Sequence, residues 1–189
     1  MIPILSNPHD SLTPEEISSF KKYLTIENFI SDDDCDKLIE LGEQSVVSAV
    51  KKHTFTNIMQ MDHCFLPKDD PIHSVLMPAW KQALSYFNID VDFIEPYKLQ
   101  RYTVGGYFGR HIDNYHGLNL PQDRKISLTL QLSNEHDYEG GNFLCGTHKI
   151  SRKKGSLTFF PSFYPHMVEK VTVGTRWSLI GWAWGPYWR

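Results

Sequence analysis

The sequence has no long apolar run, and none of its hydrophobic stretches approaches the roughly 18–20 residues needed to cross a membrane. Its first residues also lack the basic segment and extended apolar core that are typical of a secretory signal peptide. We therefore expect a cytoplasmic protein that has no membrane partner.

Cysteine is scarce and shows no pairing pattern. The three cysteines, Cys35, Cys64 and Cys145, lie far apart in the chain, and no Cys-x-x-Cys pair occurs. An odd number of widely spaced cysteines indicates reduced thiols and does not favour a disulfide framework or a cysteine-rich metal site.

An excess of charge of either sign is absent as well. Lysine and arginine total 19 and aspartate and glutamate total 22, which gives a formal net charge of −3. Nucleic-acid-binding proteins usually carry a concentrated excess of positive charge, so we expect no nucleic-acid partner. Internal repeats and low-complexity tracts do not occur, and the sequence leaves the oligomeric state open.

The length of 189 residues fits one domain with a sizeable core. We divide it into an N-terminal extension (1–24), a region of supporting helices and strands (25–96) and a β-rich region (97–189). The fold class that we expect is α+β with a mainly β core.

Two amphipathic helices are predicted in the supporting region. Ser31 is the predicted N-cap of the first helix, because the acidic run 32–34 that follows it suits the positive end of a helix dipole. A cation site at that run is the less favoured alternative, and the apolar spacing predicts a helix that ends near Gly42. A second helix is predicted over 73–87, where Pro78 either kinks the helix or marks its start. Its predicted apolar face comprises Val75, Leu76, Trp80, Leu84 and Phe87.

After Pro96 the sequence consists of short segments of β character separated by turn residues. The clearest strand is 126–132, which alternates strictly. Its apolar face comprises Ile126, Leu128, Leu130 and Leu132, and its polar face comprises Ser127, Thr129 and Gln131. This pattern, following two helices, predicts a β-sandwich or barrel braced by helices on one face.

The triplet His111-Ile112-Asp113 is the first candidate for chemistry. On a strand, His111 and Asp113 point to the same face, and a second histidine across the site would complete a 2-His-1-carboxylate Fe(II) centre. His166 is the preferred partner because it begins a strand after a proline-rich turn. Three other histidines compete with it, on loops or in turn-like contexts: His116, His136 and His148.

An Fe(II) site that binds a 2-oxo acid also needs a cation for the remote carboxylate. Arg176 suits that role, because its planar guanidinium binds carboxylates through two parallel hydrogen bonds. Ser178 points the same way, and hydroxyls from neighbouring strands could complete the pocket: Tyr102, Ser127 and Thr129. The alternatives are that Arg176 is a surface residue paired with Glu169 and that Tyr102 is a core residue.

Taken together, these motifs resemble the prolyl 4-hydroxylase-like branch of the Fe(II)/2-oxoglutarate dioxygenases. The resemblance runs from about Leu99 to Trp184 and includes Tyr-x-x-Gly, His-x-Asp and Arg-x-x-Ser-x-Thr-Leu-x-Leu. It continues with Gly-Gly, Gly-x-x-x-x-Phe-Pro, the distal histidine and Gly-x-Arg-x-Ser-Leu-x-x-Trp.

The resemblance implies a double-stranded β-helix, or jelly-roll, that holds iron through His111, Asp113 and His166. It implies that Arg176 forms a salt bridge with 2-oxoglutarate and that Tyr102 donates a hydrogen bond to the same carboxylate. Ser127 matches a family Thr or Ser at that carboxylate. The implied cofactors are Fe(II), 2-oxoglutarate as co-substrate, O₂ and, as an accessory reductant, ascorbate.

Two departures from the family pattern concern the substrate side. Collagen-type prolyl hydroxylases carry lysine where this chain has Arg176, which makes the smaller microbial members the nearer kin. The family's second aromatic before His-x-Asp falls on Phe108, beside Tyr107, so a hydroxyl on the substrate side is displaced or absent. Three aromatic residues near the C-terminus wall a substrate pocket or, in the preferred interpretation, pack in the core: Trp182, Trp184 and Tyr187.

The function implied by the resemblance is hydroxylation of an unactivated C–H bond, with a prolyl residue of a peptide or protein as the first-choice substrate. A free amino acid or another small metabolite is the alternative substrate. The rival classes are a jelly-roll sensor that binds metal without turnover and a cupin-like metal-dependent hydrolase or isomerase. A non-catalytic binder would not need the Arg176 and Ser178 pair to face the metal.

Overall fold

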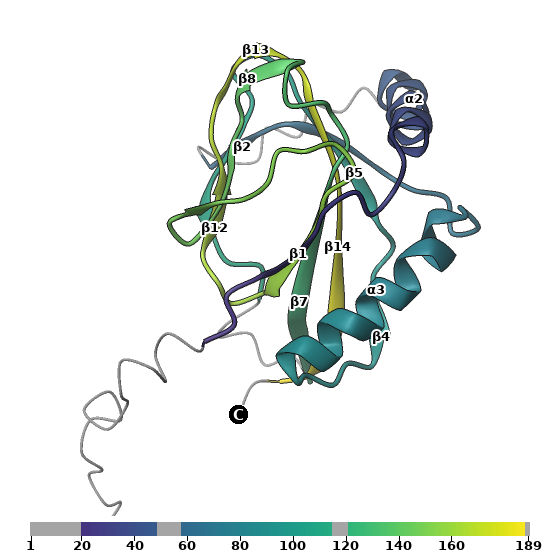
Figure 1. Ribbon diagram of the computed structural model, residues 1–189, viewed down its shortest axis with the longest axis vertical. Coiled ribbons are helices and arrows are strands. Elements are labelled where there is room, and N and C mark those ends of the chain that lie inside the picture. The colour runs from purple at the N-terminus through teal and green to yellow at the C-terminus, as the bar shows by residue number, and fades with distance from the viewer. Residues whose placement is uncertain (1–19, 49–57, 115–120, 188–189) are drawn as a thin grey trace, which may run out of the picture.

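In the computed structural model two antiparallel β-sheets face each other, and two helices cover the outer side of the larger sheet (Figure 1). The structure describes residues 20–48, 58–114 and 121–187. This is the mainly β architecture of a jelly-roll, as the sequence predicts. Neither of the two helices in the described ranges has the length and apolar character required to cross a membrane.

The larger sheet has seven strands, all paired antiparallel. Six of them follow the order β1-β11-β7-β14-β5-β3, and the short β4 pairs with β14. Their bounds are β1 (Leu24–Ile26), β11 (Leu157–Pro161), β7 (Gln122–Gln131), β14 (Arg176–Pro186), β5 (Lys98–Tyr102), β3 (Asp62–Phe65) and β4 (Phe93–Ile94).

The smaller sheet has five strands in the order β10-β9-β12-β6-β2, and β8 and β13 form a separate pair. Their bounds are β10 (His148–Lys149), β9 (Phe143–Cys145), β12 (His166–Val168), β6 (Tyr107–His111), β2 (Met59–Gln60), β8 (Tyr138–Gly140) and β13 (Val171–Gly174). The central strands of this sheet, β12 and β6, carry the two histidines of the candidate metal site.

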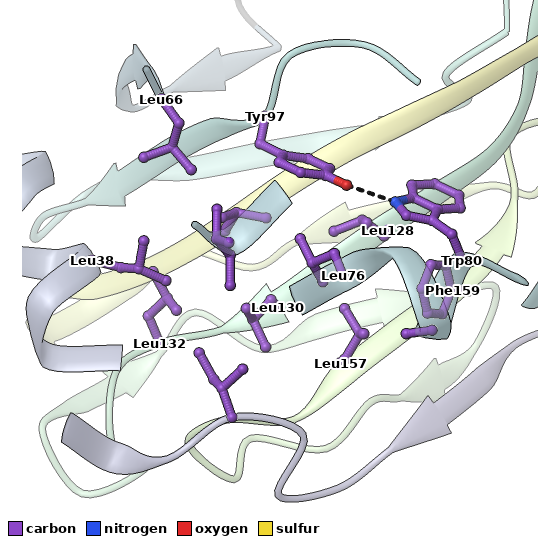
Figure 2. Close-up of a cluster of buried hydrophobic side chains, with 14 of the residues drawn as sticks. Leu38, Leu66, Leu76, Trp80, Tyr97, Leu128, Leu130, Leu132, Leu157 and Phe159 are labelled. Atoms are coloured by element: carbon purple, nitrogen blue, oxygen red, sulfur yellow. Dashed lines mark hydrogen bonds between the residues drawn. The ribbon is translucent and has the colours of Figure 1, made fainter. Parts of the chain in front are cut away.

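The alternation predicted for 126–132 is confirmed in β7. Leu130 and its apolar neighbours at every second position belong to the large hydrophobic core under the helices (Figure 2). The residues between them are polar and also buried, with Ser127 only 1% and Thr129 8% exposed. The polar residues therefore point into the space between the two sheets, which is where a site can form.

Helix α2 (Asp32–Ser48) begins as predicted and ends later than predicted. The Asp34 amide donates to the Ser31 hydroxyl at 3.2 Å, so Ser31 is the N-cap. The predicted end at Gly42 is wrong, because this glycine serves close packing and not termination. A Cβ at Gly42 would lie 2.5 Å from Cζ3 of Trp177 on β14, so only glycine allows the helix to lie this close to the sheet.

Helix α3 (Ile72–Phe87) starts one residue before the predicted start, and Pro78 lies inside it. Leu76 and Trp80 are buried as expected, but Val75 is 46% exposed, so its assignment to the apolar face is wrong. The Trp80 indole donates a hydrogen bond of 2.8 Å to the Tyr97 hydroxyl, as Figure 2 shows. Because Tyr97 immediately precedes β5, this bond ties α3 to a strand that lines the site.

Candidate active site

Two histidines and one aspartate from the smaller sheet and its edge converge on one point. His111 ends β6 and His166 begins β12, and the two residues are direct partners across the antiparallel pair. Asp113 follows just beyond β6, where its amide donates to the Ser162 carbonyl at 2.8 Å. Its carboxylate oxygens lie 3.6 Å from Nε2 of His111 and 3.3 Å from Nε2 of His166. The three side chains offer ligand atoms within 4.8 Å of one another, so they could hold a metal ion.

The backbone fixes which nitrogen of each imidazole faces this point. Nδ1 of His111 lies 2.8 Å from the Gly109 carbonyl oxygen, and Nδ1 of His166 lies 3.0 Å from that of Tyr164. A carbonyl oxygen only accepts hydrogen bonds, so each Nδ1 donates to its carbonyl and Nε2 is the nitrogen that faces Asp113. Both rings are thereby oriented as metal ligands before any ion binds.

Asp113 is held by two serines on its other side. The Ser127 hydroxyl donates to Oδ2 of Asp113 at 2.7 Å and lies 2.9 Å from the Ser162 hydroxyl. Burial would raise the pKa of Asp113, but the adjacent His166 and His111 rings outweigh it and keep that pKa well below its usual range. The carboxylate is therefore ionised. The sequence expectation was that Ser127 serves a co-substrate, whereas in the structure its hydroxyl contacts Asp113.

The strand carrying His111 is less regular than the sequence suggested. Strand β6 ends at His111, and Asp113 lies beyond it. A bulge separates the pair formed by His166 and His111 from the pair formed by Val168 and Phe108. Phe108 consequently stacks on the His111 ring, with ring centroids 3.7 Å apart and planes inclined by 10°. His111 and Asp113 therefore converge because the strand ends irregularly between them. Simple alternation along one continuous strand does not describe their arrangement.

Arg176 lies at the other end of the same cavity, on β14, and is only 2% exposed. Its guanidinium donates to the Ser178 hydroxyl at 3.3 Å and lies 5.5 Å from the Tyr102 ring centre. Glu169, the surface partner considered as an alternative, instead accepts from Asn142. Within the described ranges no carboxylate pairs with Arg176. A buried cation without a counter-ion is costly, so this end of the cavity suits the carboxylate of a ligand.

Three other predicted residues line this cavity with Arg176: Tyr102, Ser178 and Thr129. Tyr102 is fully buried and donates to Oε1 of Gln100 at 3.0 Å. Burial raises the pKa of Tyr102, although Arg176 partly opposes the shift, so the phenol keeps its proton. Gln100 is the residue that the sequence interpretation missed. Its position two residues before Tyr102, on the same face of β5, was the signal that could have identified it.

The C-terminal aromatic residues divide between the two interpretations. Trp184 packs in the fold, because its ring stacks on Phe93 and its indole donates to Glu95. Trp182 is buried and also lines the cavity, so it fits both interpretations.

The competing histidines do not join the cluster. His136 is largely exposed and contacts Glu135 at 3.9 Å. His148 lies on β10, against the Tyr23 ring. His116 falls outside the described residues. Two imidazoles and a carboxylate on one face form the donor set of non-haem Fe(II) oxygenases, and a buried arginine beyond them fits the remote carboxylate of a 2-oxo acid.

Comparison with known proteins agrees with this donor set. The sequence model of the 2OG-Fe(II) oxygenase superfamily matches residues 97–184. A PKHD-type hydroxylase of Xanthomonas campestris pv. campestris (strain B100) is 28% identical over 188 residues, which cover 92% of this chain and 75% of the relative. A PKHD-type hydroxylase of Stenotrophomonas maltophilia (strain K279a) is 35% identical over 133 residues, which cover 62% of this chain and 58% of the relative.

Solved structures show the same fold. A prolyl-4-hydroxylase of Pseudomonas putida has a TM-score of 0.72 at 17% identity, covering 92% of this chain and 97% of the other. A viral collagen prolyl hydroxylase from Paramecium Bursaria Chlorella virus-1 has a TM-score of 0.70 at 21% identity, covering 88% and 97%. A Trichoplax adhaerens prolyl hydroxylase, in complex with a peptide fragment of hypoxia inducible factor, has a TM-score of 0.67 at 16% identity, covering 89% and 86%. Residues 97–184 thus match the 2OG-Fe(II) oxygenase superfamily, and the match, the relatives and the donor set together indicate an oxidoreductase that uses Fe(II), 2-oxoglutarate and O₂.

Proposed function

We propose that this protein hydroxylates a prolyl residue of a peptide or protein. The observation that carries the dioxygenase chemistry is the buried Arg176, without a counter-ion among the described residues, in the cavity that also holds the cluster of His111, Asp113 and His166. A binding module without turnover, or a metal-dependent hydrolase, has no need for a buried cation facing its metal.

In this proposal His111, Asp113 and His166 would hold Fe(II), and the cavity that they line would receive the co-substrate. Bound Fe(II) and 2-oxoglutarate supply the oxidation of an unactivated C–H bond by O₂, with release of succinate and CO₂. Ser127 donates to Oδ2 of Asp113 and so orients the carboxylate that would serve as a metal ligand.

Arg176 binds the remote carboxylate of 2-oxoglutarate through its two-pronged guanidinium. Ser178 accepts a hydrogen bond from Arg176 and can donate its own proton to the same carboxylate. Tyr102, whose phenol stays protonated, and Thr129 are further donors that line this part of the cavity. The residues at this end therefore bind and orient the co-substrate.

The prolyl substrate is supported by the relatives. The solved structures with this fold include prolyl hydroxylases, one of them in complex with a peptide, and the sequence relatives are named as PKHD-type hydroxylases. The wall formed by Phe108, Phe143, Phe160 and Trp182 is apolar, which suits a pyrrolidine ring. A free amino acid or small metabolite is the alternative substrate.

The test is incubation of the Fe(II)-loaded protein with 2-oxoglutarate, O₂ and a library of proline-containing peptides. We expect succinate to form and mass spectrometry to show one added oxygen atom on a prolyl residue. Asp113→Ala should abolish both signals, whereas His136→Ala, at an exposed histidine outside the cavity, should change neither. Oxygen incorporation into free amino acids but not into any peptide would overturn the peptide substrate.

A further inference from the structure

Lys98 lies on the cavity side of β5, at the end opposite Tyr102. Along this strand Leu99 points into the core under the helices, whereas Gln100 and Tyr102 line the cavity. Alternation places Lys98 on the same face as those two residues. Its ammonium lies 4.8 Å from the ring centre of Trp182, which also lines the cavity. Lys98 is thus at the rim of the candidate active site.

Two aromatic rings hold the Lys98 ammonium in place. Besides Trp182, the ring of Phe65 on β3 lies 4.9 Å away, and Phe65 is itself 57% exposed. Ring faces attract a cation but do not neutralise it. Partial burial lowers the pKa of Lys98 and repulsion by Arg124 adds to that shift, whereas the carboxylates of Glu95 and Asp113 partly oppose it. The result is a positioned and partly desolvated positive charge.

The neighbouring cation forms a close ion pair, whereas Lys98 feels Glu95 and Asp113 only at longer range. Arg124 lies over the same Trp182 ring, at 3.8 Å, and donates to both carboxylate oxygens of Glu95, at 2.7 and 3.0 Å. Glu95 is therefore already engaged. In the part of the chain that the structure describes, no carboxylate forms an ion pair with Lys98. A partly buried ammonium in this state favours an incoming anion.

The anion for Lys98 is distinct from the carboxylate that Arg176 suits. On the paired strands Arg176 is opposite Tyr102, and Ile180 is opposite Lys98. The two cations are thus four residues apart along the sheet, which is about 13 Å at the usual rise of a strand. Because the two cations start from backbone positions this far apart, we assign them to different anions.

We propose that Lys98 binds a carboxylate side chain of the substrate, so that the enzyme selects peptides with an acidic residue near the target proline. This inference rests on the proposed function and deepens it by adding the sequence context of the substrate. A single ammonium between two rings offers one point charge, which suits a singly charged carboxylate better than a phosphate dianion that needs several donors.

The experiment compares fluorescently labelled peptides that contain one proline and carry glutamate or glutamine at one flanking position at a time. Binding is measured by anisotropy with the full chain. We expect about tenfold tighter binding of the glutamate peptide at the preferred position, the size typical of a partly desolvated charge pair. Lys98→Gln should abolish this preference, and Lys98→Arg should retain it.

Lys21→Gln is the matched control variant. Lys21 also lies over an aromatic ring, that of Tyr86 at 4.7 Å, but at the C-terminal end of α3, away from the cavity. It should leave the preference for glutamate unchanged. The binding of 2-oxoglutarate should be the same in wild type and Lys98→Gln, since Arg176 serves that ligand.

The proposal would be overturned if the wild type bound the glutamate and glutamine peptides equally, whichever flanking position is varied. This comparison uses the wild-type protein alone, so it does not depend on the folding of a variant. A preference that survives Lys98→Gln, or a loss of 2-oxoglutarate binding in that variant, would overturn it too. Hydroxylation of the same peptides is measured separately by mass spectrometry. Charge-selective binding without hydroxylation contradicts the prolyl substrate alone, and hydroxylation without charge selection contradicts the role of Lys98 alone.

Discussion

Ser127 and Arg176 lie on neighbouring strands of the larger sheet and are both almost completely buried, yet their polar groups are satisfied differently. The Ser127 hydroxyl bridges Asp113 and Ser162, so its hydrogen bonds are made within the protein. The Arg176 guanidinium reaches only the Ser178 hydroxyl among the described side chains. At the scale of single residues, the Ser127 hydroxyl therefore supports the candidate metal ligand Asp113, whereas the Arg176 guanidinium is available to bind a carboxylate of a ligand.

Ser127→Ala should weaken metal binding about 10–100-fold, as is usual when a partner of a metal ligand is removed. The reason is that Asp113 loses the donor that orients its carboxylate. Titration of the variant with Fe(II) under anaerobic conditions measures the effect. Ser162→Ala is the matched control, because it removes only the hydroxyl contact with Ser127 and should have a smaller effect. Equal metal affinity in wild type and Ser127→Ala would contradict this role.

Arg176→Met should abolish the binding of 2-oxoglutarate without lowering the stability of the ligand-free protein. Replacing buried ion pairs by apolar side chains of similar volume is often neutral or stabilising by about 1–4 kcal/mol, and removing Arg176 leaves no carboxylate unpaired among the described residues. Thermal unfolding with and without 2-oxoglutarate measures both effects.

Arg101→Met is the control for Arg176→Met. It makes the same substitution at an arginine that pairs with Asp62 at 2.8 Å on the outer side of the sheet, away from the cavity. It should keep the response to 2-oxoglutarate. A large loss of stability in ligand-free Arg176→Met would mean that the arginine has a structural partner.

At the scale of elements, α2 packs closely on the larger sheet at Gly42, which lies against the Trp177 ring. Gly42→Ala should destabilise the protein by about 1–3 kcal/mol, because the new methyl group would overlap the Trp177 ring. The better helix propensity of alanine, about 1 kcal/mol, offsets only part of this cost. Denaturant unfolding measures the change. Glu43→Ala, at the exposed neighbouring position, should stay within about 0.5 kcal/mol of wild type; a stabilised Gly42→Ala variant would show that the helix can move away freely.

The same helix shows what the sequence can and cannot predict. Ser31 and the acidic run after it identify the start of α2, because capping depends on a few adjacent residues. Its end could not be predicted, because the role of Gly42 depends on Trp177, which is distant in the sequence. The bulge beside Phe108 was hidden for the same reason, since it arises from pairing with β12.

The candidate site was predictable as a set of residue types and not as an arrangement. Spacing and the family resemblance identified the three candidate metal ligands and Arg176. They did not reveal that Ser127 turns to Asp113 or that Gln100 lines the cavity. Those contacts depend on how far each side chain lies from the opposite sheet. The alternation of polar and apolar residues shows only which face of the strand a side chain is on.

At the scale of the whole molecule, the cavity joins the two sheets. The histidines come from the smaller sheet, and Tyr102 and Arg176 come from the larger one. A metal together with 2-oxoglutarate would therefore bridge both sheets and stabilise the fold as a unit.

We expect Fe(II) and 2-oxoglutarate together, each near 100 times its dissociation constant, to stabilise the protein by at least about 2.7 kcal/mol. For a domain of this size that raises the melting temperature by roughly 5–10 °C. Anaerobic calorimetry measures the shift, and a chelator should reverse it. His166→Ala should show no shift on addition of metal, and a shift of normal size in that variant would contradict its assignment as a ligand.

The strict alternation of β5, β7 and β14 has a consequence for how this scaffold can diverge. Leu99, Leu130 and Leu179 are fully buried in the core under the helices. Their neighbours Lys98, Thr129 and Ile180 face the space between the sheets. Selection for a new substrate can thus act on one set of positions while the other set keeps the protein folded. Natural or laboratory evolution of specificity on these strands can proceed with little loss of stability.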